Sequence, residues 1–161
     1  MRAILIATAA VIFAAPAWAA PADVSVTIAP ALQKTFATKY GEREGVRLTA
    51  ELKSSVERAL ARTSAHEGAR IELQLTDVKP NRPTFKQLGD KPGLSLDSFG
   101  VGGAAIEGRM IGADGRETPL KYSWFETDIR NAYANWVWSD AHWVFDRFAS
   151  KLAKGEVVAR R

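Results

Sequence analysis

Hydrophobic residues along the chain follow two different spacings, and each spacing predicts a different secondary structure. In four segments apolar residues stand at every second position, which is the period of a half-buried strand. These segments are residues 24–28, 71–76, 104–111 and 120–124. Elsewhere apolar residues recur three and four positions apart, which predicts amphipathic helices from Leu48 to about Ser64 and from Asn135 to Ala153.

Between residues 79 and 103 neither spacing is present. Prolines and glycines are frequent there and exclude a long regular element. Structureless connections beyond about 12 to 15 residues in a compact domain are usually functional or disordered. The long loop 79–103 is therefore the first candidate for function. Further along, Asp114-Gly115 separates two apolar-patterned runs and predicts a hairpin.

The order of these elements predicts an α+β fold. A strand, a crossover helix and a second strand form a right-handed unit with parallel strands, and the hairpin adds an antiparallel pair. We therefore expect a two-layer sandwich, β-α-β-loop-β-β-α, with a mixed sheet of about four strands and both helices packed on one face. The other sheet face should stay polar unless a partner covers it.

The first twenty residues have the layout of a secretory signal peptide. Met1-Arg2 gives a positive start, residues 3–15 are small or apolar, and Pro16 precedes Ala17-Trp18-Ala19, a small-residue cleavage pattern. The apolar run is shorter than the roughly 20 residues that a transmembrane helix needs. We expect a signal peptide at 1–19, one domain at 20–155 and a flexible tail at 156–161. The protein should be periplasmic or secreted and should not span the membrane.

Composition narrows the chemistry. The chain of 161 residues has no cysteine, which excludes disulfides, thiol catalysis, cysteine-ligated metals and a lipid anchor on cysteine. The two histidines, His66 and His142, are not spaced as a metal-binding pair. We therefore expect no cofactor and no metal.

The positive charge is concentrated in one stretch. Twenty-two Lys and Arg against eighteen Asp and Glu give a net charge of +4, which falls to +3 when Arg2 leaves with the signal peptide. The first half of the long loop holds Lys79, Arg82, Lys86 and Lys91 but only one acid, Asp90. In an exported protein this excess favours an anionic envelope component or another envelope protein as partner, and not nucleic acid. The alternative is a solvated loop that Phe85 and Leu88 pack down.

Aromatic residues gather near the C-terminus, where nine of the thirteen after residue 19 fall between positions 122 and 148. Trp138, Phe145 and Phe148 fit a core position. Trp136 and Trp143 are seven residues apart, and we expect them to share a helix face with Asp140 off the main apolar stripe. Such a face could bind sugar rings or a protein, or belong to the rim of the core. The candidate binding residues are Lys79, Asn81, Arg82, Lys86, Lys91, Trp136, Asp140 and Trp143.

Two further patterns, one of glycines and one of carboxylates, are weaker indications of function. Gly100, Gly102 and Ala105 have the spacing of a dinucleotide-binding loop, but a strand follows where that loop needs a helix, so we expect a bulge or a close backbone approach instead. Pairs of carboxylates suited to glycoside cleavage can be drawn from a set of four acids. These are Glu107, Glu126, Asp128 and Asp140.

The order of elements and several short motifs resemble small bacterial envelope proteins of unknown function. The motifs are Gly103-Ala104, Asp114-Gly115, Trp138-Ser139-Asp140-Ala141 and Phe148-Ala149. Many such proteins are lipoproteins, and this chain departs from them in having no cysteine. The resemblance implies an accessory or binding role in the envelope and carries over no catalytic residue.

These observations favour an exported, non-enzymatic binding or accessory protein that acts through the basic loop and an aromatic helix face. Two alternatives stay open. One is a small cell-wall glycan hydrolase with a carboxylate pair that includes Asp140. The other is a homo-oligomeric structural protein in which the face with Trp136 and Trp143 is the interface.

Overall fold

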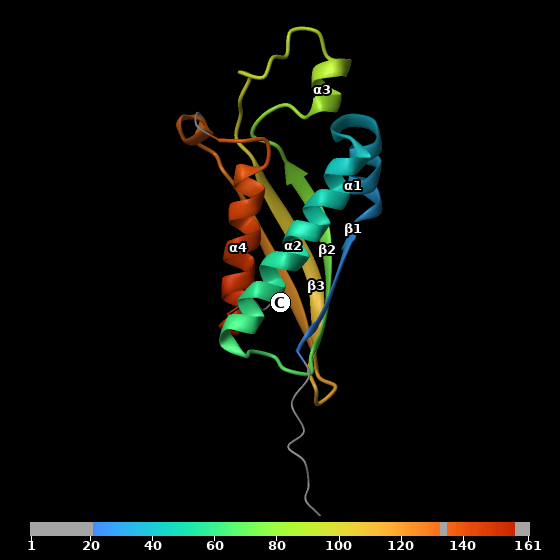
Figure 1. Ribbon diagram of the computed structural model, residues 1–161, viewed down its shortest axis with the longest axis vertical. Coiled ribbons are helices and arrows are strands. Elements are labelled where there is room, and N and C mark those ends of the chain that lie inside the picture. Colours follow the sequence, from blue (N-terminus) through green and yellow to red (C-terminus); the bar gives the residue numbers. More distant parts are fainter. Residues whose placement is uncertain (1–20, 133–134, 157–161) are drawn as a thin grey trace, which may run out of the picture.

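A computed structural model describes residues 21–132 and 135–156 and shows a four-stranded sheet covered on one face by two long helices (Figure 1). The strands lie in the order β1-β2-β3-β4, with β1 and β2 parallel and the other neighbours antiparallel. The strands are β1 (Asp23–Ile28), β2 (Arg70–Lys79), β3 (Gly103–Ile111) and β4 (Glu117–Phe125), and the long helices are α2 (Glu42–Thr63) and α4 (Ser139–Ala153). The predicted α+β sandwich with a mixed sheet is confirmed.

The core lies between the sheet and the two helices. Alternate strand residues such as Ile71, Leu75 and Ile106 are fully buried, and they belong to one core cluster with Leu52 of α2 and Phe148 of α4. The predicted core positions Trp138, Phe145 and Phe148 are also buried.

The opposite sheet face is polar, as expected, and ion pairs join its neighbouring strands. Arg109 on β3 bridges Glu72 on β2 and Glu117 on β4, at 2.8 and 3.3 Å. Lys121 pairs with Glu107 across the hairpin at 2.7 Å.

Four short elements were not predicted. The connector after β1 forms α1 (Pro30–Thr35) and a π-helical turn, η1 (Phe36–Tyr40), and α2 then begins at Glu42, before Leu48. Within the long loop lies α3 (Phe85–Asp90), whose first turn is closed by reciprocal hydrogen bonds between Thr84 and Gln87. A 3₁₀ turn, η2 (Ile129–Ala132), follows β4.

The prediction for the last helix was wrong at its start, because α4 begins at Ser139 and not at Asn135. Trp138 has a non-helical backbone, with φ −124° and ψ 24°. The Ser139 hydroxyl accepts a hydrogen bond from the backbone N–H of Trp136 at 2.7 Å, which holds the preceding chain as a turn.

Three predictions fall on residues outside the described ranges: the signal peptide, the tail after Glu156, and Tyr133 as a member of the aromatic group. Within residues 21–132 and 135–156, no helix combines the length and the apolar character that crossing a membrane requires.

Candidate functional site

The long loop is anchored to α4 by a buried pair of polar side chains, Asn81 and Asp140. They are only 1% and 8% exposed. Asp140 Oδ2 accepts hydrogen bonds from Asn81 Nδ2 at 2.6 Å and from the backbone N–H of Gly102 at 2.8 Å. Asn81 Oδ1 in turn accepts from the backbone N–H of Asp140 at 3.0 Å. The structure thus brings together two predicted site residues that are 59 positions apart.

The pair has a clear structural role. The residue before α4, Trp138, offers no side-chain cap, so Asn81 supplies the cap from the loop. Asp140 lies in the first helical turn, where the positive end of the helix dipole favours a carboxylate. At Gly102 a Cβ atom would lie 2.6 Å from Asn81 Oδ1 and 2.8 Å from the carbonyl oxygen of Lys79. The expected close backbone approach is therefore confirmed.

Arg82 ties the two arms of the loop to the segment before α4. Its Nε donates to the carbonyl of Asn135, and its Nη1 donates to the carbonyl of Leu96 at 3.0 Å. The guanidinium therefore holds the loop in shape while its charge stays at the loop surface. Arg82 is half-buried.

The remaining loop cations differ in their surroundings. Lys86 pairs with Asp90 at 2.8 Å within α3. Lys79 and Lys91 are exposed but line two different cavities. The structure therefore divides the predicted basic loop: Lys91 and Arg82 face one cavity and Lys79 another.

The first of these cavities, which we call the basic depression, has a volume of about 290 Å³ and is lined by Lys39, Arg82 and Lys91 together with Gln87 and Ser98. None of the described residues that line it carries a carboxylate. Lys39 comes from η1, which packs beside α3. Sequence reasoning missed Lys39 because the segment was interpreted as a plain connector. The geometry can hold an anionic group between amino, guanidinium and amide donors.

Another cavity, which we call the apolar groove, adjoins the basic depression. Arg82 and Pro83 line both the groove and the depression. The groove measures about 540 Å³ and is lined further by Phe85, Leu96 and Trp136. These three side chains are 84%, 68% and 82% exposed. Phe85 therefore does not pack the loop down, whereas Leu88, the other residue of that alternative, is half-buried.

The prediction that Trp136 and Trp143 share a helix face is also wrong. Trp136 precedes α4, so only Trp143 is on the helix. Trp143 stacks on Trp124 of β4 with ring centroids 4.4 Å apart and lies under the Arg147 guanidinium at 4.8 Å. It is 42% exposed and belongs to the rim of the sheet, whereas Trp136 belongs to the loop.

The four carboxylates considered for glycoside cleavage have structural contacts. Asp140 is anchored as described, and Glu107 pairs with Lys121. The backbone N–H of Asp128 and the Asn131 side chain donate to Glu126 and hold its pKa below the ordinary value. The Arg130 side chain does the same for the pKa of Asp128. A general acid needs a raised pKa, so Glu126 and Asp128 are poorly suited to that role.

The histidines are likewise engaged. His66 Nε2 lies 3.0 Å from the carbonyl of Leu152, and His142 Nε2 contacts the Glu51 carboxylate between α4 and α2. Among the residues that the structure describes, no group of three or more potential ligands is arranged to hold a metal ion.

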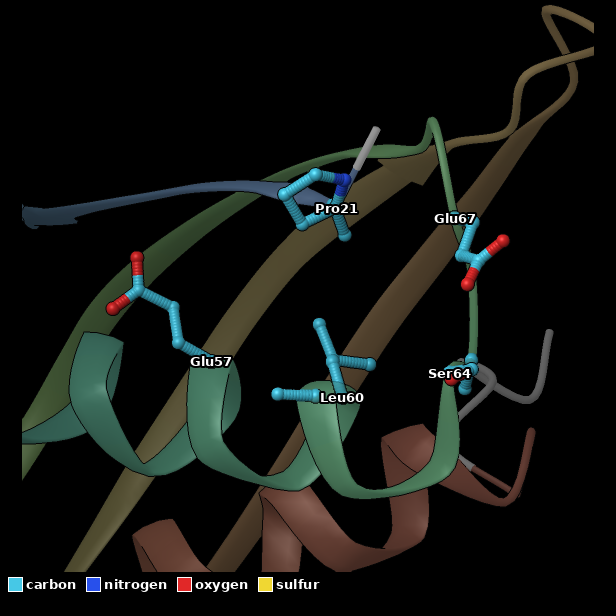
Figure 2. A pocket seen from close by; sticks show the side chains of 8 residues that line it. Pro21, Glu57, Leu60, Ser64 and Glu67 are labelled. Carbon is cyan, nitrogen blue, oxygen red and sulfur yellow. The ribbon is translucent and has the colours of Figure 1, made fainter. Parts of the chain in front are cut away.

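A further cavity, the N-terminal groove, lies at the other end of the molecule, between the start of β1 and the last turns of α2 (Figure 2). Its volume is about 410 Å³. Figure 2 shows Pro21 facing Leu60, with Glu57 on α2 and Glu67 in the connection to β2. None of the described residues lining this groove is a Lys or an Arg.

No protein family model matches the chain, and no curated protein matches it either. The resemblance to envelope proteins therefore stays an expectation. Among solved structures, the chain is similar to a minor lipoprotein from Acinetobacter baumannii, with 9% sequence identity over 80% of this chain and 88% of the other and a TM-score of 0.30. That similarity is too low to transfer a function from one chain to the other.

Proposed function

We propose that the protein is an exported, non-enzymatic binding or accessory protein of the bacterial envelope, which holds an anionic envelope component at the basic depression. The observation that carries the proposal is the set of cations there, Lys39, Arg82 and Lys91, with no carboxylate among the described lining residues. The leader-like pattern of residues 1–19 supports export.

The anchoring of the loop also supports binding. A site gains affinity when its groups are already in place before the ligand arrives. The Asn81–Asp140 pair holds the loop to α4, and the two carbonyl contacts of Arg82 join it to the segment before α4 and to the returning arm of the loop. The cations therefore lie on an ordered frame rather than on a loose chain.

Retention on immobilised heparin, a soluble polyanion, tests the proposal. We expect the wild type to be retained at low salt and released as salt screens the charges. The double variant Lys39→Ser and Lys91→Ser should elute at much lower salt. Arg82 is left unchanged because it also holds the loop backbone.

The matched control removes two exposed cations from the opposite end of the long helices, Arg62→Ser and Lys154→Ser, and has the same net charge. It should elute close to the wild type. Absence of wild-type retention, or an equal loss in both double variants, would contradict a site at the basic depression.

A further inference from the structure

We propose that the loop end of the molecule, meaning the basic depression and the apolar groove together, docks on an anionic lipid bilayer with Phe85, Leu96 and Trp136 in the interfacial layer. The inference rests on the proposed function and names the anionic component as membrane lipid. It is carried by the juxtaposition of an exposed apolar groove with a carboxylate-free set of cations.

The apolar side chains converge from separate parts of the chain. Phe85 opens α3, Leu96 lies in the returning arm of the loop, and Trp136 precedes α4, yet all three line one groove. Single exposed hydrophobic residues are ordinary, but several on one cavity mark an interaction surface. Phe and Leu suit the acyl boundary, and the indole of Trp suits the headgroup layer, because it combines an apolar body with one N–H donor.

The charge at this end fits an anionic surface. Arg82 and Pro83 line both cavities, so the Arg82 guanidinium borders the apolar groove directly, and Lys39 and Lys91 line the adjoining depression. Neither cavity has a carboxylate among its described lining residues. A cation near an anionic bilayer strengthens binding by about fivefold. Lys39 and Lys91 can therefore meet lipid phosphates while the neighbouring side chains enter the interface.

The position at the end of the molecule allows this contact. α3 and the rest of the loop project beyond the end of the sheet, on the side where α4 begins (Figure 1). A flat surface can approach this end without meeting the sheet face.

A second copy of the chain fits the same surface poorly. Two loop ends facing each other in a symmetric dimer would bring two sets of cations together without carboxylates in either cavity to compensate them. The groove therefore favours an anionic partner over self-association.

Co-sedimentation with vesicles tests the inference. We expect the chain without the predicted signal peptide 1–19 to bind vesicles of phosphatidylglycerol mixed with phosphatidylcholine and to bind pure phosphatidylcholine vesicles far less. The variant Phe85→Ser with Trp136→Ser should lose at least about tenfold in partition coefficient, because two apolar side chains no longer leave water. The matched control, Val46→Ser with Ile129→Ser, removes two exposed apolar side chains that line neither cavity and should bind like the wild type.

Fluorescence gives a readout that does not depend on the double variant folding. Brominated phosphatidylglycerol should quench the most exposed indole, Trp136, in the wild type, and Trp136→Ser should lose that quenching. Equal vesicle binding by wild type and Phe85→Ser/Trp136→Ser, or no quenching, would overturn the inference.

The two proposals fail in different ways. Retention on heparin without binding to vesicles would overturn lipid docking and leave the proposed function standing. Loss of both would overturn both. A wild-type dimer that Trp136→Ser turns into a monomer, seen by native mass spectrometry, would assign the groove to a second copy and would also overturn lipid docking.

Discussion

The basic depression and the N-terminal groove are cavities of similar scale at opposite ends of one small fold, and their chemistry is reversed. The depression is lined by Lys39, Arg82 and Lys91 without a carboxylate, and the N-terminal groove by Glu57 and Glu67 without a cation, among the residues described. The net charge of +4 does not reveal this separation. A charge arrangement of this kind orients a molecule on an anionic surface far better than its net charge suggests.

The two ends also differ in apolar exposure. The main apolar side chain of the N-terminal groove, Leu60, is only 5% exposed and belongs to the core cluster. At the loop end Phe85 and Trp136 are more than four-fifths exposed. The N-terminal groove thus borders the core, whereas the loop end leaves large apolar side chains exposed.

Removing the anchor of the loop end should have the largest effect on the difference between the two ends. Asp140→Ala leaves Asn81 Nδ2 and the N–H of Gly102 without their buried acceptor. We expect the free energy of unfolding to fall by about 3 kcal/mol, measured by urea denaturation. On the same helix Asp146 has a side chain that is 71% exposed, so Asp146→Ala should cost less than about 1 kcal/mol. An equal loss of unfolding free energy in both variants would contradict a specific anchoring role for Asp140.

A smaller disruption comes from adding one methyl group at Gly102. The new Cβ would meet Asn81 Oδ1 and the Lys79 carbonyl, so the loop or the anchor must move. Overpacking of this kind costs about 2 kcal/mol, which thermal or urea unfolding would show. Gly100→Ala is the matched control, because no heavy atom lies within 4 Å of its Cβ position. If both variants are equally stable, the close approach does not constrain the loop.

Exchanging the charges of the two ends tests whether the position of the cations matters beyond the net charge. The variant that combines Lys39→Glu and Lys91→Glu with Glu57→Lys and Glu67→Lys has the net charge of the wild type. We expect it to bind heparin through the N-terminal groove but to lose at least about tenfold in binding to phosphatidylglycerol vesicles, because its new cations lie beside a groove whose described lining includes no large exposed apolar side chain. Vesicle binding that survives the exchange would mean that net charge alone governs association.

The hydrophobic periods were sufficient to predict the sheet, its polar face and both long helices, because burial of a whole face determines those elements. They were insufficient for α1, η1 and α3, which are short and depend on local contacts. The Thr84–Gln87 capping box is visible in the sequence and could have indicated α3.

The sequence was sufficient to name several residues of the candidate site but not to predict which of them contact one another. Asn81 and Asp140 were both candidates, but a hydrogen bond across 59 positions depends on the fold. Trp136 and Trp143 were expected together because the apolar spacing continues upstream of Ser139, whereas the chain there forms a turn. Lys39 reaches the depression only through the packing of η1 beside α3.

The smallest expected effect concerns Asp97, an exposed carboxylate between Leu96 of the apolar groove and Ser98 of the basic depression. If the loop end meets anionic lipid, this charge opposes the contact. Asp97→Asn should therefore raise the partition coefficient on phosphatidylglycerol vesicles by about twofold at low salt, and the gain should vanish as salt screens it. Asp114→Asn, at the hairpin turn, makes the same charge change where lipid is not expected and should leave binding unchanged. Equal gains from both variants would show that the bilayer senses overall charge, whereas a gain at Asp97 alone places the contact at the loop end.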